Sequence, residues 1–246
     1  MVRIEQFDGA ALDFDGSNAD TRSAMTESRL EAFASMAEEL GDERYLNIDP
    51  AIHKQAHHHG SHPLEIFGWV MTQAGIIVDL VDSRATVQRA VDRRNEIYWQ
   101  KAQAGFDALP EAIETIIKLH EYLDDKISIV TTAPLDEEVM PFLKRHGIVD
   151  LFDPDYLITK DAVSRLKPDP EAYSLAMGRM GVNPDRTLAL EDAHAGIWSA
   201  RRANILEVVA LTTTHTAEEL QAFPSDERPT LITPTHADFQ RVFFNN

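Results

Sequence analysis

The sequence lacks cysteine altogether, carries few basic residues and contains no long apolar run. Without cysteine the chain can form no disulfide, no thiolate nucleophile and no cysteine-ligated zinc site. No apolar run is long enough to cross a bilayer, so we expect no membrane partner. The first residues also lack the apolar segment and small-residue cleavage site of a signal peptide. Together these absences predict a cytoplasmic protein.

Positive charge is scarce, because 23 lysines and arginines face 41 acidic residues and the net charge is −18. Nucleic-acid binding needs lysine and arginine gathered on one face. The densest basic stretches, near Arg93 and Arg201, lie in helical patterns with apolar residues, and we interpret them as solvated helix faces. We therefore expect no nucleic-acid partner. An acidic protein that handles an anion would concentrate positive charge locally, through a metal ion and one or two basic residues.

Five short apolar runs predict buried strands, at residues 10–14, 127–131, 156–158, 187–190 and 207–212. Helical patterns follow most of the later runs, at residues 111–122, 136–146, 170–180 and 194–203. Strands that alternate with helices predict an α/β fold, here a Rossmann-like parallel sheet with helices on both faces. In such a sheet the functional site lies at the carboxyl ends of the strands.

The interval between the first and second predicted strands is helical in pattern throughout. Its apolar residues recur with helical spacing at residues 23–40, 63–74 and 83–104. We therefore predict an all-helical cap domain, residues 18–104, inserted into an α/β core domain of residues 1–17 and 105–246. The hinges between the two domains are expected near residues 17–22 and 101–109.

Polar residues gather at or after the ends of the predicted strands. The groups are Asp13 with Asp15, Thr131 with Thr132, Lys167, and Glu191 with Asp192. Residues two apart at a strand end point the same way, so Asp13 and Asp15 can face one site. Two carboxylates this close repel each other unless a cation or a shared proton compensates.

Phosphoryl transfer requires the residue types that these groups supply. Mg²⁺ binds proteins through one or two carboxylates together with phosphate oxygens. A lysine and a metal ion neutralise charge on the transferring phosphoryl group. A carboxylate nucleophile divides the reaction into two easier steps through an aspartyl-phosphate. We therefore predict a Mg²⁺-dependent enzyme that acts on a small phosphorylated metabolite.

The order of these groups resembles the four motifs of the haloacid-dehalogenase-like hydrolase superfamily. Within it, the chain looks like the subgroup with a small helical cap, which includes phosphoglycolate phosphatase and beta-phosphoglucomutase. The matching stretches are Asp-Phe-Asp-Gly-Ser from Asp13, the threonine Thr131, Lys-Pro-Asp-Pro from Lys167 and Glu-Asp-Ala-His-Ala-Gly-Ile from Glu191. The resemblance covers about residues 8–16 and 105–212 and is weak across the predicted cap. It implies a phosphatase that hydrolyses a small phosphate monoester.

The resemblance also implies catalytic roles. Asp13 would attack phosphorus, while Asp15 would protonate the leaving group and then deprotonate the hydrolytic water. Thr131 and nearby backbone amides would hold phosphate oxygens, and Lys167 would stabilise the intermediate.

The same resemblance implies a Mg²⁺ site. Its ligands would be the Asp13 carboxylate, the Asp15 carbonyl and Asp192, with Glu191 in support. Either member of the Glu191–Asp192 pair could be the direct ligand, and we favour Asp192. The substrate-binding residues expected beside them are Gly16 and Thr132.

Two other functions are compatible with this fold. A phosphosugar mutase would return the phosphoryl group to the sugar, but such enzymes carry an arginine shortly after a glycine that aligns with Gly60, and this chain has none there. A non-catalytic phosphometabolite-binding protein would be expected to have lost one of the residues above, and none is lost. Dehalogenation is disfavoured because Asp15 has no role in it.

Two positions depart from the residues usual in the family. Asn18 stands where the family usually has an apolar residue, and Ala193 where it commonly has serine. His53 and His57 are four residues apart, as metal-binding pairs on a helix can be, and so are His58 and His62. We favour a loop or polar surface for these histidines over a metal site. Both a monomer and a homodimer are compatible with the sequence.

Overall fold

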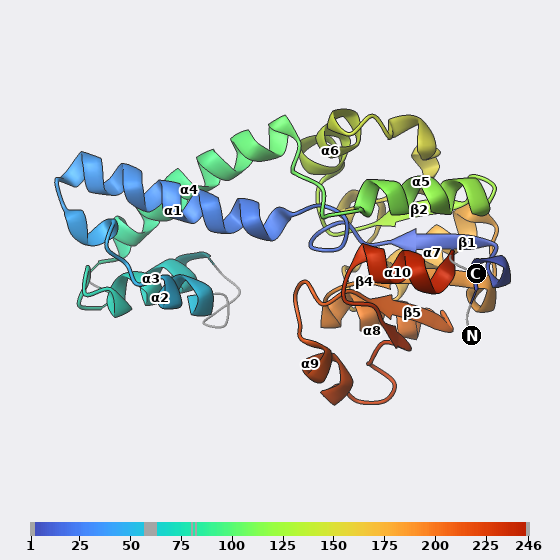
Figure 1. Cartoon of the computed structure of the whole chain (residues 1–246). Helices are drawn as coiled ribbons and strands as arrows, with labels where there is room; N and C mark the ends of the chain where they lie inside the picture. Colours follow the sequence, from blue (N-terminus) through green and yellow to red (C-terminus); the bar gives the residue numbers. More distant parts are fainter. Residues whose placement is uncertain (1–2, 57–62, 80, 82, 245–246) are drawn as a thin grey trace. The chain divides into compact units, whose positions relative to one another are not determined.

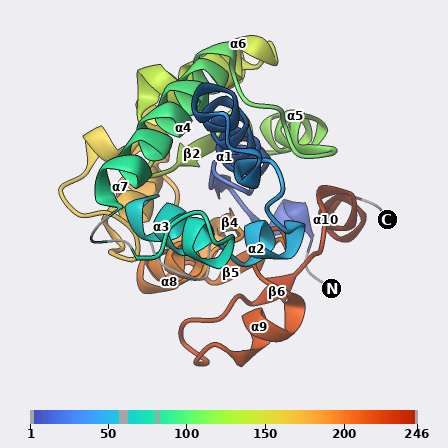
Figure 2. The same ribbon diagram turned by 90° about the vertical axis from the view of Figure 1, so that its left-hand side faces the viewer.

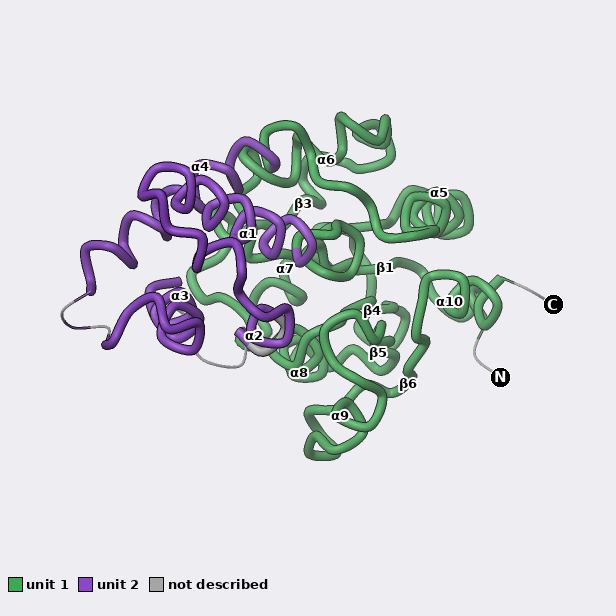
Figure 3. The backbone as a smooth tube through the Cα atoms, turned by 60° about the vertical axis from the view of Figure 1, so that its left-hand side comes forward, with its two compact units in different colours: residues 1–21, 102–246 green, residues 22–101 purple. Residues whose placement is uncertain are grey.

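The computed structural model describes the chain except residues 1–2, 57–62, 80, 82 and 245–246 (Figure 1). The chain divides into two compact units, shown in different colours in Figure 3. The α/β unit comprises residues 1–21 and 102–246, and the helical unit comprises residues 22–101. The boundaries predicted from the sequence lie a few residues away from these breaks, and the roles of core and cap stay a prediction.

A parallel sheet forms the centre of the α/β unit, which confirms the predicted fold class. Its strands run in the order β3-β2-β1-β4-β5-β6, and every neighbouring pair is parallel. The strands are β1 (Gly9–Leu12), β2 (Ile127–Val130), β3 (Leu157–Ile158), β4 (Thr187–Glu191), β5 (Glu207–Ala210) and β6 (Leu231–Ile232). Strands β1, β2 and β4 are buried along their whole length, as expected for a sheet covered on both faces.

Helices cover both faces of this sheet. Figure 2 shows α5 (Ala112–Tyr122) and α10 (His236–Phe243) on one side, and α7 (Glu171–Met180) and α8 (His194–Arg202) on the other. Tyr173 of α7 and Ile197 of α8 belong to one buried cluster with Val130 and Val208 of the sheet. The remaining helices of the unit are α6 (Met140–Arg145) and α9 (Ala217–Ala222).

The helical unit has its own buried core. Its helices are α1 (Thr21–Leu40), α2 (Pro50–Gln55), α3 (Pro63–Gln73) and α4 (Arg84–Ala104). Phe33 of α1, Phe67 and Met71 of α3, and Val87 of α4 are buried together. Among the described residues, no helix combines the length and the apolar character that crossing a bilayer requires.

The two chain segments that connect the units are hydrogen-bonded to each other within the α/β unit. The Asp20 amide donates to the Asp107 carbonyl at 2.8 Å, and the Leu109 amide donates to the Asn18 carbonyl at 2.9 Å. Ala19 and Ala108 form an antiparallel bridge between these bonds. We call this pairing of residues 18–20 with residues 107–109 the linker clasp. It pairs the chain shortly before the helical insertion with the chain shortly after it.

Candidate active site

The carboxyl ends of three adjacent strands bring the predicted site residues together. Asp13 directly follows β1, Thr131 directly follows β2, and Glu191 ends β4. Backbone bonds hold these ends in register, since the Asp13 amide donates to the Leu190 carbonyl at 2.9 Å. Because β1 lies between β2 and β4, side chains that leave these ends meet at one edge of the sheet.

Lys167 lies at the centre of the site. Its Nζ donates to Asp13 Oδ1 at 2.6 Å, to Glu191 Oε1 at 2.7 Å and to the Val130 carbonyl at 2.8 Å. These three bonds use all the donors of an ammonium group. Burial alone would lower the pKa of Lys167, but the charges of Asp13 and Glu191 outweigh it and raise that pKa above its ordinary value. Lys167 is therefore a fixed positive charge beside two carboxylates.

Three buried carboxylates surround this single lysine. Asp13, Glu191 and Asp192 each offer an oxygen within 4.8 Å of the others. Burial, followed by the charge of Glu191, raises the pKa of Asp13 well above its usual range and raises the pKa of Asp192 to about 6. The cluster carries more negative charge than Lys167 can neutralise, and all its donor atoms are oxygen. Such a donor set fits a hard divalent cation.

Glu191 and Asp192 differ in their partners. Glu191 Oε1 accepts bonds from Lys167 and from the Tyr173 hydroxyl, the latter at 2.5 Å. Among the residues that the structure describes, the Asp192 carboxylate accepts only hydroxyl bonds, from Ser17 at 3.4 Å, from Thr213 at 3.3 Å and from Thr214. The carboxylate of Glu191 is therefore occupied by a charged donor, whereas the partners of Asp192 are all neutral.

Asp15 stands apart from the acidic cluster. The Thr131 hydroxyl donates to Asp15 Oδ2 at 3.0 Å and accepts a bond from the Ala133 amide at 2.9 Å. Burial raises the pKa of Asp15, and the bond from Thr131 only partly offsets this. A carboxyl group with a raised pKa suits general acid catalysis near neutral pH. The structure thus places Thr131 next to the proposed acid, while Thr132 is exposed.

Two glycines make room for the carboxylates. Gly16 has φ of +73°, which few other residues adopt, and a Cβ there would collide with Asp192 Oδ2. A Cβ at Gly196 of α8 would collide with the carboxylate of Glu191. The role of Gly16 in substrate binding stays a prediction.

Several site residues escaped the sequence analysis. They are Tyr173, Thr213, Thr214 and His236. Ser17 belongs to the Asp-Phe-Asp-Gly-Ser stretch, but its bond to Asp192 was not expected. The threonines follow β5 and have the same strand-end signal that identified Thr131. The other contacts join distant parts of the chain, and no local pattern marks them.

Two further side chains form hydrogen bonds to the backbone of the loop that begins at Asp13. Asn18 Nδ2 donates to the Asp13 carbonyl at 2.5 Å. His236 Nε2 lies 2.7 Å from the Ser17 carbonyl, and burial lowers the pKa of His236. The neutral imidazole therefore donates through Nε2, because a carbonyl can only accept.

Ala193 leaves the start of α8 without a side-chain cap. It occupies the N-cap position, where no side-chain hydrogen bond is formed. A serine there would accept a bond from the first turn of the helix, so the departure noted in the sequence has a structural consequence.

The loop or polar surface expected for the histidine cluster is wrong for His53, which lies buried in α2. His57, His58 and His62 lie outside the described residues. His53 is buried against Phe33 in the helical unit, with 5.8 Å between the ring centroids.

Each of the curated relatives described next matches part of this chain. Validoxylamine A 7'-phosphate phosphatase of Streptomyces hygroscopicus subsp. limoneus is 41% identical over 128 residues, which cover 48% of this chain and 57% of that protein. Hexitol phosphatase A of Escherichia coli (strain K12) is 35% identical over 100 residues, which cover 40% of this chain and 44% of that protein. The chain thus spans about half the length of the curated relatives it matches.

Solved structures share the fold over almost the whole chain. A HAD family hydrolase from Deinococcus radiodurans R1, solved with bound phosphate and sodium, has a TM-score of 0.71 and 18% identity, covering 97% of this chain and 95% of that chain. A beta-phosphoglucomutase from Clostridium difficile has a TM-score of 0.54 and 20% identity, covering 93% and 91%. These likenesses concern the fold alone.

The sequence model that describes haloacid dehalogenase-like hydrolases matches residues 11–210. This span includes the strand ends that carry Asp13, Thr131 and Glu191, together with Lys167. The chain therefore belongs to the haloacid dehalogenase-like hydrolase family.

Proposed function

We propose that this protein is a phosphatase that hydrolyses a small phosphate monoester through an intermediate on Asp13. The observation that carries the proposal is the buried Asp13 carboxylate, held 2.6 Å from the Lys167 ammonium at the end of the central strand. The relatives named above are phosphatases, and a further one, from Thermotoga maritima, is named phosphorylated carbohydrates phosphatase. A phosphorylated sugar or polyol is therefore the substrate class to examine first.

In the first proposed step, Asp13 attacks the phosphorus atom of the ester. Lys167 binds Oδ1 of Asp13, which leaves Oδ2 as the attacking oxygen. The bond between phosphorus and the alcohol oxygen breaks, and Asp15 transfers its proton to that oxygen. The raised pKa of Asp15 supports this role, because the group must carry a proton at neutral pH.

In the second proposed step, water replaces Asp13 on phosphorus. The Asp15 carboxylate, now deprotonated, takes a proton from the water as its oxygen attacks. The bond between phosphorus and Asp13 breaks, phosphate leaves, and both carboxyl groups return to their starting states. The Thr131 hydroxyl holds Asp15 in place during both steps.

The acidic cluster is the proposed Mg²⁺ site. Its ligands would be the Asp13 carboxylate, the Asp15 carbonyl and Asp192, and Glu191 would support them from its bonds to Lys167 and Tyr173. Mg²⁺, when bound, would supply positive charge beside the phosphate oxygens and favour the ionised form of Asp13. Gly16, Thr131, Thr132 and the backbone amides after β2 are the proposed contacts for the phosphate.

The test is phosphate release from a panel of sugar and polyol phosphates in the presence of Mg²⁺. Asp13→Asn is expected to abolish release, because an amide is a far weaker nucleophile than a carboxylate. Asp8→Asn is the matched control, since Asp8 precedes the same strand at its other end and pairs with Arg186 at the surface. A chelator is expected to stop release, and added Mg²⁺ to restore it.

Near-normal phosphate release by the Asp13→Asn variant would show that Asp13 is not the nucleophile. If the wild type releases no phosphate from any ester, the phosphatase proposal fails. Exchange between sugar-phosphate isomers would then identify a mutase, and its absence would favour a non-catalytic binding protein.

The cytoplasmic location, the monomeric or homodimeric state and the cap role of the helical unit belong to the same proposal. Cell fractionation and light scattering measure the first two. Steady-state kinetics of variants in the helical unit measure the third.

A further inference from the structure

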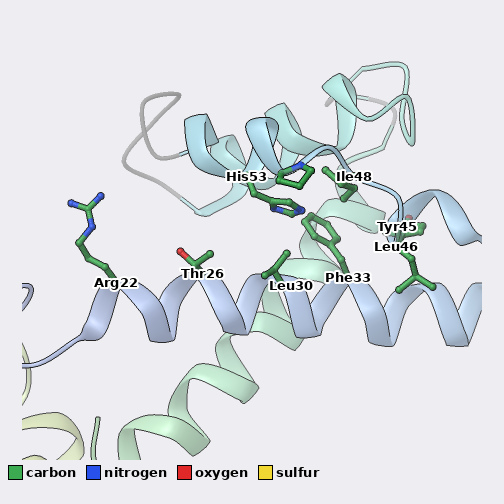
Figure 4. A pocket seen from close by; sticks show the side chains of 9 residues that line it. Arg22, Thr26, Leu30, Phe33, Tyr45, Leu46, Ile48 and His53 are labelled. Carbon is green, nitrogen blue, oxygen red and sulfur yellow. The ribbon is translucent and has the colours of Figure 1, made fainter. Parts of the chain in front are cut away.

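The helical unit contains a pocket that the proposed chemistry does not use. Its volume is about 630 Å³, within the range that small-molecule sites occupy. One wall is a side of α1, and the other is α2 together with the segment that leads into it (Figure 4). The lining residues are Arg22, Thr26, Leu30, Phe33, Tyr45, Leu46, Ile48, Pro50 and His53.

Polarity changes along the α1 wall of this pocket. Arg22, Thr26, Leu30 and Phe33 recur at helical spacing and lie along one side of α1 (Figure 4). The rise of 1.5 Å per residue separates the first from the last by about 16 Å along the helix axis. The wall therefore runs from a cation through a hydroxyl to an aliphatic and an aromatic side chain. A matching ligand has an anionic end and an apolar body.

The apolar part of the pocket is incompletely covered. Leu30 is 44% exposed on one wall, and Leu46 is 60% exposed on the other. Covering exposed apolar surface is favourable, so a ligand with an apolar body gains affinity between these two leucines. Phe33, which is buried, closes the pocket behind them.

Arg22 supplies the positive charge at one end of the pocket. Arg22 forms no hydrogen bond or ion pair with any residue that the structure describes. His53 adds no second charge, because burial and the nearby Arg29 lower its pKa to about 4. Nδ1 of His53 is buried without a partner, which leaves the imidazole free to adjust its hydrogen bonding to a bound molecule. One cation at one end fits one anionic group.

We propose that this pocket binds an organic anion with an apolar body, whose anionic group pairs with Arg22 and whose body lies between Leu30, Leu46 and Phe33. Two sources could supply this chemistry, namely the organic part of the enzyme's own substrate or a separate regulatory ligand.

A matched pair of fluorescent probes tests the proposal on the intact chain. The anion 8-anilinonaphthalene-1-sulfonate and the neutral N-phenyl-1-naphthylamine share one aromatic body, and only the first carries a sulfonate. We expect the wild type to bind the anion about fivefold more tightly, as a partly exposed charge pair provides. Arg22→Gln should remove this preference and leave the affinity for the neutral probe unchanged. Thr26→Trp, which fills the pocket, should weaken the binding of both probes.

Arg84→Gln is the control for charge, because Arg84 is an exposed arginine elsewhere in the helical unit. Equal affinity for the two probes in the wild type would overturn the proposal. So would full binding in Thr26→Trp, or an equal loss of the preference in Arg84→Gln and Arg22→Gln. These binding measurements need no turnover, so they stand or fall separately from the proposed phosphatase activity.

Inhibition of phosphate release separates the two sources once binding is established. Competitive inhibition, with KM raised and kcat unchanged, assigns the pocket to the substrate. A change in kcat, or no change in either parameter, assigns the pocket to a separate ligand.

Discussion

The carboxylate of Glu191 occupies the space that a side chain at Gly196 would fill. A Cβ at that position would meet both oxygens and the carboxyl carbon. Glu191 in turn holds the Lys167 ammonium at 2.7 Å. A single absent methyl group in α8 therefore supports the position of the lysine beside Asp13.

Gly196→Ala should move Glu191 and disorganise the site. We expect a loss of about 1–3 kcal/mol in the free energy of unfolding, as overpacking a buried site usually costs, together with a strong fall in phosphate release. Gly178→Ala is the matched control, because nothing lies within 4 Å of the place that a Cβ on this helical glycine would take. That change should stabilise the protein by about 0.5–1 kcal/mol. Similar effects of both substitutions on urea unfolding would contradict this account.

The buried imidazole of His53 makes the free energy of unfolding depend on pH. Burial lowers its pKa from 6.5 to about 4, so between these values the unfolded chain binds a proton that the folded chain does not. The contribution of His53 is complete above pH 6.5 and is lost as the pH falls toward 4. Between pH 7 and pH 5 the wild type should lose up to about 2 kcal/mol through this group.

Urea unfolding of the wild type and of His53→Leu at both pH values measures this effect. The variant should lose less stability than the wild type on acidification. Equal losses would show that His53 does not titrate as its burial implies.

At the scale of elements, α10 has a larger role than its place near the end of the chain suggests. His236 in its first turn donates to the Ser17 carbonyl at 2.7 Å, and the Ser17 hydroxyl donates to Asp192. Helix α10 lies beyond the residues that match the family model. It therefore supports the loop after β1 from outside the span that the family model matches.

His236→Ala should loosen this loop. The Ser17 carbonyl would lose its partner in a residue with no exposed surface, which costs about 1–3 kcal/mol. We expect kcat for phosphate release to fall as well, since Asp192 loses its positioning. His236→Gln keeps a donor and should restore part of both quantities. His120→Ala, in α5, controls for the loss of a histidine, and no rescue by glutamine would contradict the role of the hydrogen bond.

The strands that carry the candidate site could be predicted, because each is an apolar run that ends in polar residues. The runs that became β1, β2 and β4 are buried throughout, and their polar neighbours meet at one edge of the sheet. The predicted family and the predicted fold are confirmed, whereas the roles of the site residues stay predictions.

Two elements were harder to predict. The helix expected at residues 136–146 begins as a π-helical turn, Leu135–Val139, and becomes a regular α-helix only at Met140. Pro141 explains why the regular α-helix begins only there, because proline is accepted in the first turn of a helix but not in its interior.

Helix α10 had usable signals in its Thr235 cap and in Phe239 and Phe243, four residues apart. Its contact with Ser17 joins residues 219 positions apart and leaves no local trace.

For the molecule as a whole, the linker clasp predicts that the α/β unit can fold without the helical unit. Replacing residues 22–101 by a short glycine-serine linker keeps both paired segments, whose backbone bonds measure 2.8 and 2.9 Å. The α/β unit also keeps its own buried cluster. We expect a monodisperse protein with cooperative urea unfolding and α/β circular dichroism. A chain without a cooperative transition, compared with the full-length protein, would show that the insertion is needed for folding.

The linker clasp also bears on how this protein can change over generations. Both ends of the insertion are anchored by main-chain atoms, which most substitutions leave in place. A lineage can therefore rewrite, lengthen or exchange the inserted helices while the sheet and its carboxylates are inherited unaltered. Selection for a new ligand would then act on the part of the gene that encodes the insertion, and selection for the reaction on the parts that encode the α/β unit. The two parts could accumulate substitutions at different rates.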